Sequence, residues 1–157
     1  MGETPQISEK VRSRSRPDLS EVAWLQRHAR RHVACSPHPP MQELRAETFE
    51  PRLASGIVIV ECWAPWCDPC RAFLSVYEAA SARHADVTFA SVNAELQPGL
   101  AAALRISTIP TTLAFRDRIL VYVHSGFMLA EALDTLVQKV RRLDMTIVRR
   151  KLAAFAV

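Results

Sequence analysis

The chain lacks any long apolar run. Its 157 residues are 49% hydrophobic and 23% charged, yet no stretch reaches the eighteen or more apolar residues of a membrane-spanning helix. The N-terminus has no apolar core behind its basic residues, which a secretory signal needs. We therefore expect a soluble, unsecreted, cytoplasmic protein with no membrane span. Four acidic residues among the first 21 argue against an organelle import leader, which stays a minor alternative.

Aromatic residues are also scarce, at 7% of the chain. The net charge of +4 comes from the two ends: residues 1–45 hold eight basic and five acidic groups, and residues 146–157 hold three basic groups and no acidic one. The chain has no interleaved aromatic and basic residues of the kind that single-stranded nucleic-acid binding uses. We therefore expect no nucleic-acid partner.

Cysteine is limited to four residues, with a single C-x-x-C motif. In an unsecreted chain, such a motif more often indicates redox or metal chemistry than a framework of structural disulfides. The residues around the motif have to separate these two possibilities.

The most informative stretch is an apolar run followed by this motif. Four β-branched residues, Ile57–Val60, predict a strand that is buried on both faces. Pro69 suits the first turn of a helix, where its missing N–H costs nothing. Cys67 and Cys70 therefore come at a helix start, whose free N–H groups and partial positive charge favour a thiolate. We predict that Cys67 is the nucleophile and that Cys70, on the same helix face, resolves the mixed disulfide.

Glu61 is the one acidic residue on the predicted strand. Side chains alternate along a strand, so Glu61 shares a face with Ile57 and Ile59 and points into the core. Burial of a carboxyl group raises its pKa, which is typical of a proton-transfer group, and Cys70 is the natural partner for that transfer. The alternative is a glutamate at the strand end that reaches solvent. Cys62, on the other face, is expected to be an inert core thiol.

The rest of the chain divides into three parts. Residues 1–43 are expected to form a basic, partly disordered extension with one helix over Val22–Val33. Residues 144–157 are expected to form a basic and apolar C-terminal extension, for which one alternative is a continuation of the preceding helix. Between them, the pattern predicts an α/β domain. Its expected elements are helices near residues 48–53, 67–84, 100–104 and 130–143, and strands at 57–62, 87–92, 111–115 and 119–123.

Two motifs in this order resemble the thioredoxin family. The first is Trp63-Ala64-Pro65-Trp66-Cys67-Asp68-Pro69-Cys70-Arg71, directly after a strand, and the second is Ile109-Pro110-Thr111. The resemblance covers about residues 44–143. It implies a thioredoxin-like fold, with a mixed central sheet of four to five strands flanked by helices.

The resemblance also implies a function. A thioredoxin-type protein-disulfide reductase takes part in electron transport and cell redox homeostasis, acts on disulfide-containing proteins, and receives electrons from an NADPH-dependent thioredoxin reductase. It needs no cofactor or metal beyond its redox-active disulfide, here Cys67–Cys70. The matching positions place Trp66, Ile109 and Gly126 in the substrate groove, and Pro110 in a cis peptide beside the dithiol. Glu61 stands where typical thioredoxins have a buried aspartate.

Three positions depart from the family pattern: Asp68 replaces the usual glycine between the cysteines, Ser75 a helix-kinking proline, and Asp117 a hairpin glycine. Asp68 and Pro69 are therefore expected to tune the redox reaction. A single negative charge near the Cys67 thiolate opposes it by roughly 0.7 kcal/mol in water-like surroundings, less than the ~2 kcal/mol that a helix start can supply. The reduction potential should move by about 15 mV toward the reducing side.

Three other readings stay open. An oxidase or isomerase would need an oxidising compartment. A binding or chaperone module could use the domain as a scaffold whose basic extensions recruit a partner, but such a module would need neither sulfur. Zinc could bind to Cys62, Cys67 and Cys70, with Cys35 as a fourth candidate ligand, although strand alternation directs Cys62 away from the pair. A second zinc spacing, less favoured than a surface histidine cluster, comprises His28, His32, Cys35 and His38.

Overall fold

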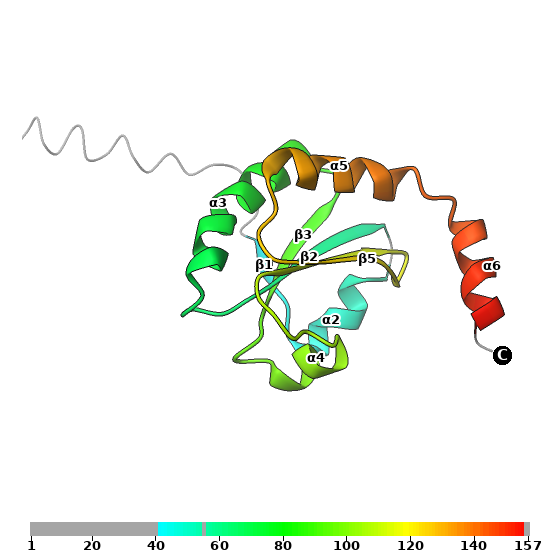
Figure 1. Ribbon diagram of the computed structural model, residues 1–157. Helices are drawn as coiled ribbons and strands as arrows, with labels where there is room; N and C mark the ends of the chain where they lie inside the picture. The colour runs from blue at the N-terminus through cyan, green and yellow to red at the C-terminus, as the bar shows by residue number, and fades with distance from the viewer. Residues whose placement is uncertain (1–40, 55, 156–157) are drawn as a thin grey trace, which may run out of the picture. The chain divides into compact units, whose positions relative to one another are not determined.

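A five-stranded sheet forms the centre of the computed structural model, which describes residues 41–54 and 56–155 (Figure 1). The predictions for the Val22–Val33 helix and for the histidine cluster at residues 28–38 lie outside these residues. The strands are β1 (Gln42–Glu43), β2 (Ile57–Trp63), β3 (Thr88–Asn93), β4 (Thr111–Arg116) and β5 (Ile119–Ser125). The described helices are α2 (Ala46–Arg52), α3 (Asp68–Arg83), α4 (Pro98–Ala103), α5 (Ala130–Arg141) and α6 (Met145–Phe155).

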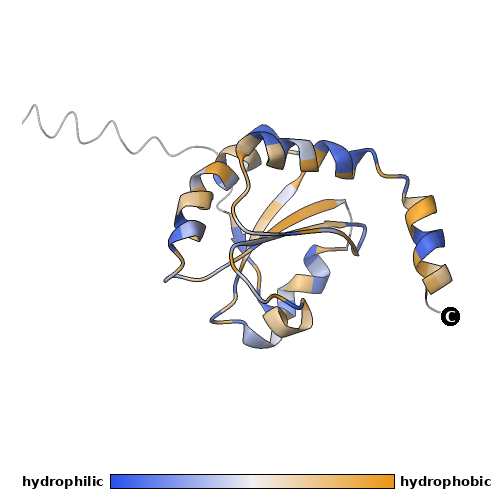
Figure 2. Cartoon of the chain, viewed as in Figure 1, coloured by the Kyte–Doolittle hydropathy of each residue, from blue (hydrophilic) through white to orange (hydrophobic). Residues whose placement is uncertain are grey.

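The sheet is mixed, in the order β1-β3-β2-β4-β5. Strand β2 lies in its middle and pairs with β3 in parallel and with β4 in antiparallel orientation. A central parallel strand is covered on both faces, which is why β2 is almost continuously apolar. Figure 2 shows this concentration of hydrophobic residues along the central strands. The predicted α/β class and mixed sheet are confirmed.

Two separate apolar clusters fill the two faces of the sheet. One contains Ile59 with residues of α3 and α5, including Phe73, Tyr77, Leu133 and Val137. The other contains Val58, Val60 and Cys62 with Phe49 of α2, and Leu100 packs against it from α4. Figure 1 shows α3 and α5 on one side of the sheet, and α2 and α4 on the other. The predicted alternation of β2 side chains is therefore confirmed.

Helix α3 is fastened to the sheet by a buried tyrosine. The Tyr77 hydroxyl lies 2.8 Å from the Ile59 carbonyl oxygen on β2 and 2.9 Å from the Ala90 carbonyl oxygen on β3. At the C-terminal end of the helix, the guanidinium group of Arg83 donates to the Asp134 carboxylate of α5 at 2.9 Å. These bonds hold the C-terminal half of α3, and the fully buried Phe73 packs its N-terminal half into the same core, so the first turn has a fixed place at the end of β2.

The β4–β5 hairpin turns through Asp117 and Arg118, both of which have positive φ values, 50° and 70°. Two-residue hairpin loops favour this conformation because it matches the twist of the strands, but it normally selects Asn or Gly. The Asp117 carboxylate accepts a hydrogen bond from the Gly56 N–H at 3.1 Å, and the Asp117 N–H donates to the Gly56 carbonyl at 3.0 Å. These bonds tie the turn to the start of β2 and offset the missing glycine.

The C-terminal segment forms its own helix and does not continue α5. Helix α5 ends at Arg141, and the Asp144 carboxylate then accepts a hydrogen bond from the Thr146 N–H at 2.9 Å, as an N-cap does at a new helix. Within the described residues, no helix is both long and apolar enough to span a bilayer.

Candidate active site: a disulfide at a helix start

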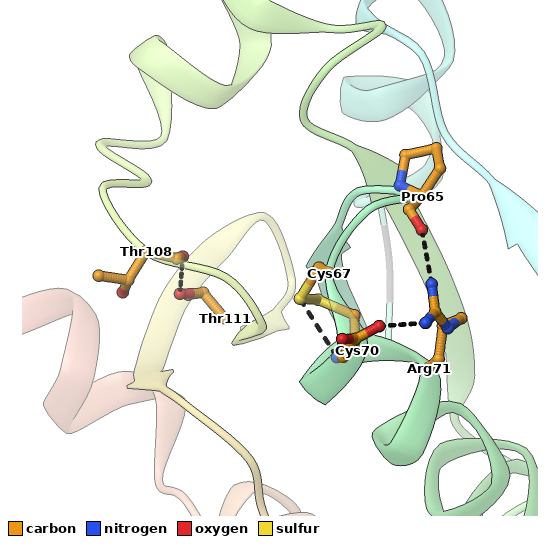
Figure 3. Close-up of a disulfide and its surroundings, with 7 residues drawn as sticks. Pro65, Cys67, Cys70, Arg71, Thr108 and Thr111 are labelled. Carbon is orange, nitrogen blue, oxygen red and sulfur yellow. Dashed lines mark hydrogen bonds and ion pairs between the residues drawn. A yellow bond between two sulfur atoms is a disulfide. The ribbon is translucent and has the colours of Figure 1, made fainter.

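The two cysteines of the C-x-x-C motif form a disulfide at the first turn of α3. Cys67 is the N-cap residue of this helix, and the Cys67 and Cys70 sulfurs are 2.14 Å apart. The Cys70 N–H points at the Cys67 sulfur, with 3.2 Å between nitrogen and sulfur (Figure 3). Both residues are buried, at 4% and 3% exposure. The predicted pairing is present, and it represents the oxidised state of a dithiol.

The helix start supplies the electrostatics for a thiolate at Cys67. Pro69 lies within the first turn, where its missing N–H removes no helical bond. The Cys70 N–H is one of the N-terminal donors that have no partner further along the helix, and it is directed to sulfur. A sulfur that accepts this bond at the positive end of the helix dipole is stabilised as an anion.

Asp68 is paired with a residue that the sequence analysis did not single out. An Arg71 guanidinium nitrogen forms an ion pair with Asp68 Oδ1, and another donates to the Pro65 carbonyl oxygen at 3.2 Å (Figure 3). The spacing of three residues on a helix, acid before base, is the signal that could have found the ion pair. The expected shift of about 15 mV treats Asp68 as an isolated charge, so this pairing acts against it.

Glu61 lies behind the disulfide and is 2% exposed, so it points inward as predicted, and the solvent-reaching alternative is wrong. Its Oε1 atom has no hydrogen-bond partner among the described residues. Burial raises the pKa of Glu61 to about 7. Glu61 and Cys70 line the same cavity of about 370 Å³. A carboxyl group that titrates near neutrality therefore faces the space beside the second cysteine.

Cys62 occupies the opposite face of β2 and is fully buried. Burial, and secondarily the neighbouring Glu61 charge, raises the pKa of Cys62 to about 12. Such a thiol is not a nucleophile at neutral pH. Within residues 41–54 and 56–155, no group of three or more His, Cys, Asp or Glu side chains is placed to hold a metal ion.

An exposed tryptophan and the loop before β4 form a shallow depression of about 290 Å³. Trp66 is 69% exposed and lines this depression together with Ile109. The Ile109–Pro110 peptide bond is cis. Gly126 does not line the depression, but its N–H donates to the Pro110 carbonyl oxygen at 2.7 Å, and its φ of 104° is readily adopted only by glycine.

The comparisons with known proteins agree with this geometry. The family model described as Thioredoxin matches residues 40–142. A putative thioredoxin 2 of Streptomyces coelicolor is 38% identical over 112 residues, which covers 71% of this chain and 84% of that protein. Thioredoxin of Bacillus subtilis is 30% identical over 94 residues, which covers 59% of this chain and 90% of that protein.

Among solved structures, the thioredoxin Mala s 13 of Malassezia sympodialis is similar, with a TM-score of 0.59. The match covers 64% of this chain and 93% of the other, at 23% sequence identity. This likeness supports the fold.

Proposed function

Because the chain belongs to the thioredoxin family and is a thiol-disulfide oxidoreductase of the protein-disulfide reductase type, we propose a specific set of roles for its residues. Cys67 attacks the substrate disulfide, Cys70 resolves the mixed disulfide between Cys67 and the substrate, and Glu61 accepts the Cys70 proton. The observation that carries this proposal is the buried Glu61 carboxyl group, whose Oε1 atom has no partner among the described residues and which lines the same cavity as Cys70 of the disulfide.

The reaction begins with the reduced dithiol. The Cys67 thiolate attacks one sulfur of a substrate disulfide, so that a Cys67–substrate disulfide forms and one substrate thiolate leaves. Glu61 then takes the proton of the Cys70 thiol, and the resulting thiolate attacks the Cys67 sulfur. The second substrate thiolate leaves, and the Cys67–Cys70 disulfide of the structure is formed. Two electrons have passed from the dithiol to the substrate.

The depression lined by Trp66 and Ile109 is proposed as the substrate-docking surface. Its exposed tryptophan offers apolar area beside the dithiol, and backbone groups of the loop at Ile109–Pro110 can pair with an extended segment of a disulfide-containing protein. Gly126 supports this loop through the Pro110 carbonyl. A large side chain at Gly126 would have to adopt a left-handed backbone, which is strained.

We place the reaction in the cytoplasm, with electrons supplied by an NADPH-dependent thioredoxin reductase. The roles of the protein there would be electron transport and cell redox homeostasis. The support is chemical, because a disulfide reductase turns over only where its dithiol is regenerated, and cytosolic reducing systems do this.

The test is the reduction of insulin disulfides by dithiothreitol with wild type, Cys67→Ser and Cys70→Ser. The proposal expects wild type to accelerate the reaction and both variants to lose this activity. Glu61→Gln should retain the dithiol but lose turnover most strongly above pH 7, where wild-type Glu61 is ionised and able to accept a proton. A wild type no faster than dithiothreitol alone would overturn the proposal, and an unchanged pH profile in Glu61→Gln would remove Glu61 from it.

A further inference from the structure

We propose that Arg71 is a positioning residue that neutralises Asp68 and holds the active-site loop so that Cys67 can form a thiolate. The inference deepens the proposed function and rests on it for the role of Cys67. Arg71 is 62% exposed at its side chain and Asp68 is 80% exposed, so neither is needed to fill the core. Core packing therefore does not explain why Arg71 pairs with Asp68 and also contacts Pro65.

Arg71 holds the chain on both sides of the nucleophile. Its side chain donates to the Pro65 carbonyl oxygen, two residues before Cys67, at 3.2 Å, and forms an ion pair with the carboxylate of Asp68, which follows Cys67 directly. Its backbone N–H donates to the Cys67 carbonyl oxygen at 3.2 Å. Figure 3 shows the guanidinium group between Pro65 and the disulfide-bearing turn. One side chain thus connects the loop to the helix that follows it.

The bridge has an electrostatic consequence. An isolated carboxylate next to Cys67 opposes a second negative charge on sulfur, whereas an ion pair presents little net charge. Arg71 therefore cancels the cost that Asp68 would otherwise impose on the thiolate. Because both side chains are exposed, the effect is screened by salt.

Arginine suits this position better than lysine. The planar guanidinium group donates in two directions at once, here to a carbonyl oxygen and to a carboxylate, whereas a lysine ammonium acts as a point charge on a flexible stem. The lysine variant therefore separates the charge of Arg71 from its bridging role.

Other ionisable groups surround the same turn. Glu61 of β2 and Glu78 of α3 line a cavity together with Arg71, and Glu95, after β3, lines the depression at Trp66. These groups are the same in all the variants compared below. Differences between the variants therefore report on Arg71 and Asp68 alone.

The experiment measures the midpoint pH of Cys67 alkylation by iodoacetamide in the reduced full chain, with the modified site mapped by mass spectrometry. Arg71→Gln should raise this midpoint by about half a unit, the shift from one charge at about 7 Å in water. Asp68→Asn should lower it by a similar amount, and the double variant should return close to wild type. In 1 M NaCl the differences should fall to about a fifth of a unit or less.

Arg71→Lys should keep the wild-type midpoint, because the charge remains. It should still share with Arg71→Gln a faster hydrogen exchange at the Cys67 amide, since the bond to Pro65 is lost. The matched control is Arg83→Gln, which removes the same charge from the far end of α3, where Arg83 pairs with Asp134. Its midpoint should equal that of wild type.

Equal midpoints in wild type and Arg71→Gln, or a shift that persists in 1 M NaCl, would overturn the electrostatic role. Unchanged exchange in both Arg71 variants would overturn the bridging role. These outcomes are independent of the proposed function. A wild type that fails to reduce insulin defeats the proposed function alone, whereas normal turnover with coinciding midpoints defeats only the inference about Arg71.

Discussion

The two faces of β2 carry two neighbouring buried residues, Glu61 and Cys62, for which we propose opposite roles. Glu61 lies on the face covered by α3 and α5, beside a cavity that reaches Cys70, and its pKa is raised to about 7. Cys62 lies on the face covered by α2 and α4, in a buried apolar cluster, and its pKa is raised to about 12. Burial raises both values, yet only the first brings a group into the range where it titrates at neutral pH.

This difference shows that burial alone does not bring an ionisable side chain into the pKa range for proton transfer at neutral pH. A carboxyl group begins well below neutrality, so desolvation moves its pKa toward the working pH, whereas a thiol begins above neutrality and is moved further away. A cavity beside the carboxyl group, such as the one that Glu61 shares with Cys70, then provides space for proton transfer. Apolar residues pack on both faces of β2. Strand alternation adds Glu61 to one of them, which we call the chemical face, and Cys62 to the other, which we call the packing face.

The largest effect should come from a cavity on the packing face. Leu113 is fully buried on β4 opposite Val60, and Leu113→Ala should lower the free energy of unfolding by about 3 kcal/mol, because the site is left partly empty. Urea denaturation measures this loss. The matched control is Leu120→Ala on β5, where the side chain is 42% exposed, and this change should cost about 0.5 kcal/mol or less. Insulin turnover per folded Leu113→Ala molecule should equal that of wild type. A loss of turnover would show that the packing face also affects the redox reaction.

On the chemical face, the ionisation of Glu61 should make the free energy of unfolding depend on pH. Below pH about 4.5 Glu61 is protonated in both the folded and the unfolded chain, so its ionisation does not change the free energy of unfolding. As the pH rises from there to about 7, the unfolded chain releases its proton first, and the free energy of unfolding falls. The loss should reach roughly 3 kcal/mol above pH 7.

The measurement compares urea denaturation of the oxidised protein at pH 5 and pH 8.5. Glu61→Gln cannot ionise, so the part of the fall that comes from Glu61 should disappear in this variant. If wild type and Glu61→Gln lose the same stability between these two pH values, Glu61 does not carry the raised pKa.

A smaller effect is expected at Cys62. Cys62→Ala removes one buried sulfur and should lower the free energy of unfolding by about 1 kcal/mol, with insulin turnover unchanged. In native reduced wild type, a thiol reagent at pH 8 should modify Cys62 far more slowly than Cys67. Rapid modification of Cys62 before unfolding would show that its face is not a closed core.

The smallest effect should come from the hairpin turn at Asp117 and Arg118, which lies between strands β4 and β5. Arg118 has a φ of 70°, a left-handed conformation that costs a residue with a Cβ about 1 kcal/mol. Arg118→Gly should therefore raise the free energy of unfolding by roughly 0.5 kcal/mol, after the added entropy of glycine in the unfolded chain. Arg118→Ala serves as the control, since it removes the charge but keeps the strained conformation. A glycine variant no more stable than the alanine variant would contradict this account of the turn.

The elements nearest the site were predictable because local signals agree there. The β-branched run at Ile57–Val60 specifies a buried strand, and its period of two places Glu61 inward without any tertiary information. Pro69 marks the helix start, which the structure places at Asp68. The cis peptide at Pro110 followed from the family resemblance and not from the residues alone.

Other features depend on tertiary contacts. Strand β1 has only two residues, Gln42–Glu43, both exposed, and it exists because it pairs with β3. Such a strand has no hydrophobic period to detect. The separate helix α6 depends on one capping carboxylate, at Asp144. The bond from Arg71 to Pro65 depends on how a long side chain crosses a loop, which spacing does not determine.

The most direct test of the central claim maps the disulfide that traps substrate. The reduced Cys70→Ser variant is mixed with insulin whose disulfides are intact. The covalent adduct is then digested, and mass spectrometry locates the cysteine to which insulin is attached. Our account predicts a single mixed disulfide at Cys67, because the helix start favours its thiolate and Cys70 is no longer present to resolve it. An adduct at Cys62, or no adduct while wild type reduces insulin, would contradict the account of Cys67 as the nucleophile and Cys62 as an inert core thiol.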